Sequence, residues 1–325
     1  MTQDWRLLHD AAEHALRFHR LDEAERRARE ALDAAAASGA SAPDVQHIRR
    51  TLIDILTTTE NYRGAREVAT EWVSGLERDP ATEPWQMAMA LRRLATIAAE
   101  LDDVKAANAA FRRARKALEE ASGPWEPAVG ECLRDQAELL MNHDRIDDAI
   151  PLFRRALTVF ETELGPDAPE VCDVLLNLGE CLAISGDGHG AKRYLWRGMV
   201  MSSYIYGPGD PATGGAVLAF GEFLLEHDDA RDASPLLHRA LAIYEEDEGL
   251  NGPGVANCLR ALAVLHSRLN EPELAFLRYR RALAIWESDP ASAGLLPELY
   301  ATYADLADAA NRPDDATAAR KRAAK

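Results

Sequence analysis

Apolar residues recur at helical spacing along the whole chain, in segments separated by short polar breaks. In residues 169–207 this spacing predicts a first helix of about 15 residues. The sequence Ser-Gly-Asp-Gly at 185–188 predicts a turn, because glycine tolerates positive φ and aspartate can hydrogen-bond local backbone. A second helix follows, and the Gly- and Pro-rich run 206–211 ends it. The predicted unit is therefore a helix-turn-helix.

This unit repeats from one end of the sequence to the other. A proline at the first position of a helix loses no hydrogen bond, and such prolines recur every 42 residues at Pro127, Pro169, Pro211 and Pro253. A period of this size predicts an all-α solenoid of stacked units. Eight alanines, called here the ladder alanines, recur at nearly the same interval, in steps of 41 or 42 residues. They are Ala24, Ala65, Ala107, Ala149, Ala191, Ala233, Ala275 and Ala316.

Two further columns of small residues accompany these alanines. One column lies twelve residues before each alanine, with Ile53 as its exception, and the other lies seven residues after it, with Trp72 as its exception. Small side chains at matched positions let paired helices approach closely. An isolated pair cannot bury both of its faces, so stability is expected to come from stacking on neighbouring pairs.

These columns resemble the tetratricopeptide repeat (TPR), which has small residues at equivalent places. The 42-residue spacing and the linkers at 164–169 and 206–211 are similar to the kinesin-light-chain-like subclass, as is the second-helix segment 281–285. The resemblance implies a right-handed α-solenoid whose first helices line a concave groove for peptides, and it implies no chemistry. We expect a single array over residues 1–325, with repeats at about 4–42, 43–84, 85–126, 127–168, 169–210, 211–252, 253–294 and 295–325.

The resemblance also indicates which first-helix positions face the groove. At one such position the eight repeats carry His9, Arg50, Arg92, Arg134, Leu176, Leu218, Arg260 and Ala301. Arginine suits carboxylates because its planar fork can donate two parallel hydrogen bonds. The predicted ligand is an extended peptide with acidic residues beside an apolar anchor. The predicted peptide-binding residues are Arg50, Arg92, Arg134, Leu176, Leu218 and Arg260.

An alternative explanation is that these arginines form ion pairs on their own helices. Asp54 follows Arg50 by four residues, and Glu138 follows Arg134 by four. Such pairs contribute only about 0.2–0.5 kcal/mol. Arg92 has Thr96 at the corresponding place, so it is the strongest ligand candidate of the three.

Trp196 departs from the repeat pattern in a second helix. The residue before each of a 42-spaced set of outer-face arginines is usually polar, but before Arg197 it is Trp196. A large aromatic there suggests an interaction or self-association surface. The favoured alternative is local packing beneath a neighbouring loop.

Composition narrows the classes of partner. The net charge of −17 and pI near 5.0 argue against nucleic acid and anionic membranes. No stretch approaches the ~18 uncharged apolar residues that a membrane span needs. The N-terminus is charged and the four cysteines lack CxxC pairing, which favours the cytoplasm. Arginine outnumbers lysine 32 to 5, which hints at a GC-rich bacterial genome.

The sequence contains no recognisable catalytic or metal motif. His9, His14 and His19 are five residues apart, whereas ligands on one helix favour spacings of three or four. We therefore expect no metal, no cofactor and no enzymatic activity. The leading hypothesis is a scaffold that binds a protein or peptide segment in its groove. The alternatives are a ligand-responsive regulator of another protein and an oligomeric assembly component.

Overall fold

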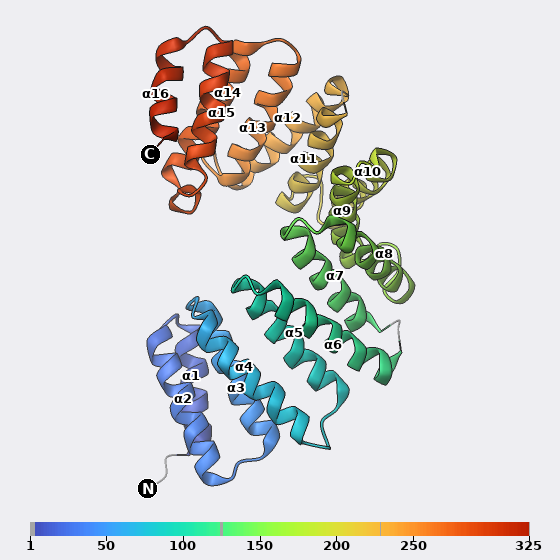
Figure 1. Cartoon of the computed structure of the whole chain (residues 1–325), viewed down its shortest axis with the longest axis vertical. Helices are drawn as coiled ribbons and strands as arrows, with labels where there is room; N and C mark the ends of the chain where they lie inside the picture. Colours follow the sequence, from blue (N-terminus) through green and yellow to red (C-terminus); the bar gives the residue numbers. More distant parts are fainter. Residues whose placement is uncertain (1–3, 124–125, 228, 325) are drawn as a thin grey trace. The chain divides into compact units, whose positions relative to one another are not determined.

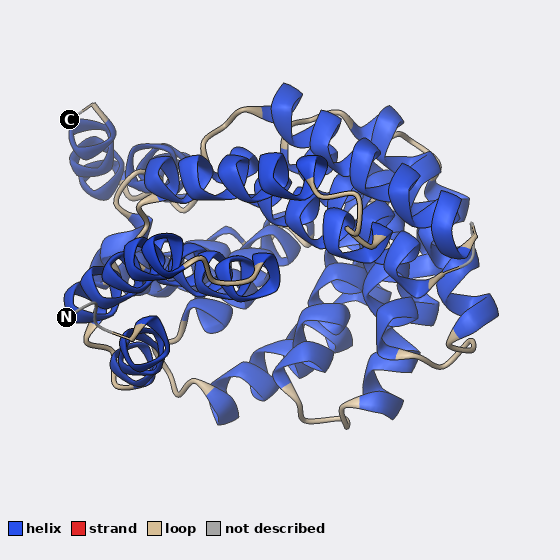
Figure 2. Cartoon of the chain, turned by 90° about the horizontal axis from the view of Figure 1, so that it is seen from below, coloured by secondary structure: helices blue, strands red, loops and turns tan. Residues whose placement is uncertain are grey.

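The computed structural model describes residues 4–123, 126–227 and 229–324, and within them all regular structure is helical (Figures 1 and 2). No helix in these ranges is long and apolar enough to cross a membrane. The helices are α1 Trp5–Arg17, α2 Leu21–Ser38, α3 Ala42–Thr58, α4 Tyr62–Arg78, α5 Pro84–Glu100, α6 Val104–Ser122, α7 Pro127–Asn142, α8 Ile146–Glu163, α9 Pro169–Ile184, α10 Gly188–Ile205, α11 Pro211–Glu226, α12 Ala230–Asp247, α13 Pro253–Arg268, α14 Pro272–Ser288, η1 Pro290–Ser292, α15 Leu296–Ala309 and α16 Pro313–Ala323.

The helices fall into two compact units, Met1–Leu164 and Gly165–Lys325. The first unit contains α1 to α8 and the second contains α9 to α16. Inside each unit every helix contacts the next one along the chain, most extensively within the pairs that share a short turn. The predicted all-α, TPR-like fold is confirmed. The expectation of one array across both units stays a prediction.

A left-handed residue joins the two helices of most pairs. Among the described turns of this kind, the one in the fifth pair has glycine there, Gly186 at φ 88°, where the sequence predicts a turn. Elsewhere L-residues adopt this conformation, at a cost of about 1–2 kcal/mol each. Side chains at the next position then cap several second helices, as when Asn61 accepts a hydrogen bond from the Gly64 amide. The other left-handed turn residues are His19, Glu60, Asp102, Asp144, Asn270 and Asn311.

Buried small residues let the paired helices approach closely. All eight ladder alanines are 0% exposed. A Cβ placed on Gly179 of α9 would lie only 2.6 Å from Leu195 Cγ of α10. At the equivalent positions of the second repeat the sizes are reversed, because the first helix carries Ile53 and the second carries Ala69, and both are fully buried. The large residue at Ile53 is thus accompanied by a small residue at the position that Leu195 has in the fifth repeat.

The outer-face arginines connect consecutive second helices. Arg155 of α8 donates to Glu119 of α6 at 2.6 Å, and Arg281 of α14 donates to Glu245 of α12 at 2.9 Å. Each pair spans 36 residues of sequence. Arg281 also donates to the Leu250 carbonyl in the preceding linker. These side chains join neighbouring repeats as well as facing solvent.

The four cysteines are buried and unpaired. Burial raises the pKa of Cys132 and Cys258 to about 12 and that of Cys172 and Cys181 to about 11. The thiols therefore act as small core residues, as the sequence predicts.

Substitutions in the turns test the left-handed positions. Glu60→Gly is expected to raise the free energy of unfolding by about 1 kcal/mol, because glycine removes the steric cost at φ 56°. Gly186→Ala is expected to lower it by a similar amount. A Cβ on Gly186 would meet no atom within 4 Å. The stability lost in Gly186→Ala therefore reports the backbone conformation alone. Thermal denaturation measures both, and destabilisation by Glu60→Gly would contradict the argument.

Candidate functional site

Arg92 of α5 is already engaged by two acids of α7. Its Nη2 and Nε donate to the same oxygen of Asp135, at 2.7 and 3.2 Å, and its Nη1 donates to Glu131. Burial works to lower the pKa of Arg92, but the Asp135 carboxylate raises it above its usual value. The expectation that Arg92 lacks an acidic neighbour considered only its own helix. The acids lie one repeat away.

The other two predicted arginines of the first unit differ in their partners. Arg134 contacts Asp135 at 2.9 Å and its helix neighbour Glu138 at 3.6 Å, so the expected intrahelical pair is present. Asp54, the expected partner of Arg50, instead pairs with Arg93 of α5. Arg50 donates to His47 Nδ1 at 3.1 Å, and no described carboxylate forms an ion pair with it.

In the second unit, the predicted residues lie on α9, α11 and α13. Leu176 and Leu218 are half-buried. Leu176 packs onto α10, since a Cβ on Gly198 would lie 2.6 Å from Leu176 Cδ2. Arg260 donates to Glu222 of α11 at 2.6 Å. Burial raises the pKa of Glu222, neighbouring glutamates add to the rise, and Arg260 opposes it.

A cavity of about 420 Å³ opens between the first helices of the first unit, and Arg50 and Arg92 both line it. Second helices contribute Trp72 and Leu118. The cavity thus combines aromatic and aliphatic walls with guanidinium groups. Its lining residues are Arg50, Asp54, Trp72, Trp85, Ala88, Met89, Arg92, Arg93, Thr96, Leu118, Ala128 and Asp135.

Trp72 is the unusual feature of this cavity. Its side chain is only 4% exposed, yet its indole Nε1–H has no hydrogen-bond partner among the described residues. Buried donors are rarely left unpaired, because an unsatisfied group costs about 1–3 kcal/mol. Trp85, also in the lining, is 54% exposed. A ligand could satisfy the indole donor and cover Trp85.

Sequence reasoning missed this aromatic wall, although a signal for it was present. The repeat pattern distinguishes Trp72 as an exception to a small-residue column, but it does not distinguish Trp85 or Met89. In the fifth repeat, glycine at the equivalent position, Gly198, lies directly against Leu176. A tryptophan under Arg50 instead changes the space between the helices. The signal for the cavity is therefore the departure of Trp72 from the small-residue column.

Trp196 lies on α10 in the second unit and is 55% exposed, so no described loop covers it. The packing alternative favoured from the sequence is wrong for this reason. Val200 and Tyr204 follow at four-residue intervals and are also exposed, Tyr204 at 82%. The three side chains form an apolar stripe on one helix face.

The family model described as the tetratricopeptide repeat matches residues 216–288. A sequence search among curated proteins finds no match. These findings and the solved structures that follow confirm the predicted resemblance to TPR proteins, including kinesin-light-chain-like ones.

Three solved structures illustrate the similarity of fold. The apo quorum sensor NprR from B. thuringiensis has a TM-score of 0.70 at 10% identity, over 96% of this chain and 84% of its own. The Rap conjugation gene regulator of plasmid pLS20, in complex with the Phr* peptide, has a TM-score of 0.55 at 16% identity, over 86% and 73%. TPR-like repeats of a kinesin light chain from P. anserina have a TM-score of 0.55 at 12% identity, over 61% and 94%.

The ion pairs of Arg92 predict a structural role for this residue. Arg92→Met is expected to lower the free energy of unfolding by about 1–2 kcal/mol, because Asp135 is 19% exposed and loses its best donor. Arg113→Met is the control, since Arg113 and Glu77 are 55% and 47% exposed and should contribute less than about 0.5 kcal/mol. Denaturant titration compares the two variants. Equal losses would show that Arg92 is no more than a surface residue.

Proposed function

We propose that the chain is a non-catalytic interaction scaffold that binds an extended peptide or protein segment. The TPR-like fold supports a scaffold role in general. The finer assignment to a peptide rests on the cavity that Arg50, Trp72 and Trp85 line. The cytoplasm is the proposed place of action, supported by four cysteines without a disulfide.

The observation that carries the proposal is a buried donor beside a guanidinium that has no described carboxylate partner. Trp72 Nε1–H has no described partner, and Arg50 has no described carboxylate partner. A peptide carbonyl could accept from the indole, while an acidic side chain accepts from Arg50. An apolar peptide side chain would pack on Trp85 and Met89, which are both exposed.

The other predicted residues have different roles in this proposal. Arg92 and Arg134 already have acidic partners, so their proposed role is to hold neighbouring first helices in place around the site and not to contact the peptide. In the second unit, Leu176, Leu218 and Arg260 would bind their own part of a partner. Arg260 lines a separate cavity of about 540 Å³ there.

A ligand-responsive regulator is the form of this function that two structural neighbours favour. NprR is titled a quorum sensor, and the Rap protein is titled a conjugation gene regulator in complex with a peptide. Both share the fold with this chain. Their peptide and regulatory roles motivate the proposal without transferring any residue.

A second candidate function is self-assembly through α10. The exposed stripe of Trp196, Val200 and Tyr204 favours it, and a second copy of this chain is the proposed occupant. Aromatic side chains commonly anchor protein interfaces.

Arg50→Ala tests peptide binding. The probes are capped nonapeptides with a central leucine flanked by glutamates, and matched peptides flanked by lysines. Fluorescence anisotropy should show preferential binding of the glutamate series. Arg50→Ala should weaken it about tenfold and reduce its salt dependence, because a charge-assisted hydrogen bond is lost.

Arg78→Ala provides the matched control, since Arg78 is exposed at the end of α4 and does not line the cavity. It should leave the affinity unchanged. Equal binding of both peptide series, or equal affinities for Arg50→Ala and wild type, would defeat the assignment.

Trp196→Ala tests self-assembly. Sedimentation velocity of the wild-type chain at rising concentration should show a dimer, and the substitution should shift it toward monomer. Trp85→Ala is the control because Trp85 is equally exposed, at 54% against 55% for Trp196. A monomeric wild type, or the same shift in both variants, would rule out this surface.

A further inference from the structure

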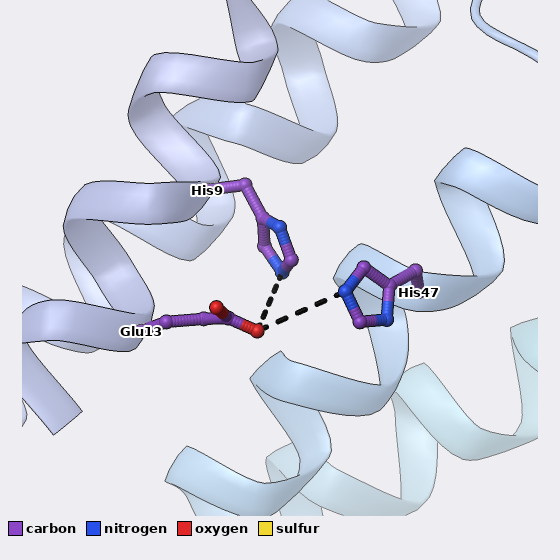
Figure 3. Close-up of side chains that lie close together, drawn as sticks. All are labelled: His9, Glu13 and His47. Atoms are coloured by element: carbon purple, nitrogen blue, oxygen red, sulfur yellow. Dashed lines mark ion pairs between the residues drawn. The ribbon is translucent and has the colours of Figure 1, made fainter. Parts of the chain in front are cut away.

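Two histidines and a glutamate from α1 and α3 point toward one another (Figure 3). Glu13 Oε1 lies 4.0 Å from His9 Nε2 and 3.8 Å from His47 Nε2. The three ligand atoms all lie within 4.8 Å of one another. We propose that His9, Glu13 and His47 bind a divalent transition-metal ion such as Zn²⁺, and that the bound ion releases Arg50 from His47.

The donor set matches this class of ion. Imidazole nitrogen and carboxylate oxygen are ligands that Zn²⁺ accepts, and three protein ligands leave a fourth position for water. Metal–ligand bonds of about 2.0–2.1 Å at tetrahedral angles place ligand atoms roughly 3.3–3.5 Å apart. The three ligand atoms must therefore move closer together on metal binding. His47 and Glu13 can move, because their side chains are 47% and 35% exposed.

His9 supplies the fixed side of the site. It is buried, and its ring contacts that of His47 edge-on, with centroids 4.7 Å apart. Its Nε2 lies 2.9 Å from Thr51 Oγ1, a contact that the metal would replace. Thr51 would keep its hydrogen bond to the His47 carbonyl at 3.3 Å. Arg17 also faces Glu13, at 3.9 Å, and is the cation that the metal would displace.

The spacing of histidines along one helix predicts no metal site, but ligands can also come from two helices. His9, His14 and His19 are indeed poorly spaced for joint coordination. The structure instead combines the i,i+4 pair His9 and Glu13 with His47 from the next first helix.

Arg50 is coupled to this site through the His47 ring. A guanidinium only donates, so the contact of Arg50 Nη2 with His47 Nδ1 at 3.1 Å requires Nδ1 to carry no proton. A neutral His47 then carries its proton on Nε2, the atom that faces Glu13. A metal at Nε2 shifts that proton to Nδ1. Arg50 loses its acceptor and is left to bind an acidic ligand.

The geometry places the consequence next to the proposed peptide site. Arg50 and His47 line a small cavity of about 150 Å³ together with Trp72 and Trp85. Metal binding would therefore make Arg50 available where the peptide is proposed to bind. Only this coupling rests on the proposed function, because the metal site stands independently of any peptide.

Metal binding is tested on the full, tag-free chain. Wild type should bind one Zn²⁺ by calorimetry and should give a visible absorption band with Co²⁺. His47→Ala and Glu13→Gln should each weaken Zn²⁺ binding at least about tenfold, since each removes a ligand. His14→Ala, an exposed histidine on the same helix, should bind as wild type does. Circular dichroism confirms that the variants remain folded.

The outcomes separate the site from its coupling. Absence of the Co²⁺ band, or Zn²⁺ binding that both ligand variants retain, would overturn the metal site. If the glutamate-flanked nonapeptide binds, Zn²⁺ should tighten its binding several-fold in wild type but not in Arg50→Ala. Unchanged peptide affinity would overturn the coupling alone. If no peptide binds, the proposed function fails, while the Co²⁺ and Zn²⁺ measurements still decide the metal site.

Discussion

The structure depends on how closely the two helices of each pair can approach. Fully buried alanines and glycines form the contact, and at Gly179 a single added Cβ would collide with Leu195. Each small side chain buries little area, so these contacts offset the conformational entropy lost on folding only when they are densely packed. The same constraint is met by exchange at Ile53 and Ala69, where the larger side chain moves to the partner helix.

A larger residue without such compensation creates a different environment. Trp72 stands where other repeats carry alanine or glycine, and it forms a wall of the cavity beneath Arg50. Its unpaired indole donor is the kind of cost that a structural core would avoid. The first unit therefore combines a regular scaffold with one local exception, and the candidate chemistry gathers at that exception. His47 of the histidine and glutamate cluster lies on α3, the helix that also carries Arg50.

Ion pairs between charged side chains connect neighbouring repeats, which the amino-acid composition alone does not reveal. Arg92 reaches acids 39 and 43 residues away, and Arg155 reaches one 36 residues away. These separations are close to the repeat length because equivalent helices lie beside each other. Each partly exposed pair contributes little free energy, but many of them restrict how neighbouring repeats pack. They also decide which guanidinium groups are available to a ligand.

The sequence by itself determined the helical units, their period and the buried small-residue columns, because each depends on spacing within about 42 residues. It also identified Arg50 and Arg92 as candidates. Only the tertiary structure decided that Arg92 is paired and that Arg50 faces a histidine, since those partners come from other helices or from rotamer choice. The Trp72 cavity and the meeting of His9 with His47 likewise required coordinates. Periodicity specifies which residues of a helix face its neighbouring helices. The contacts that their side chains make depend on distances that no one-dimensional pattern contains.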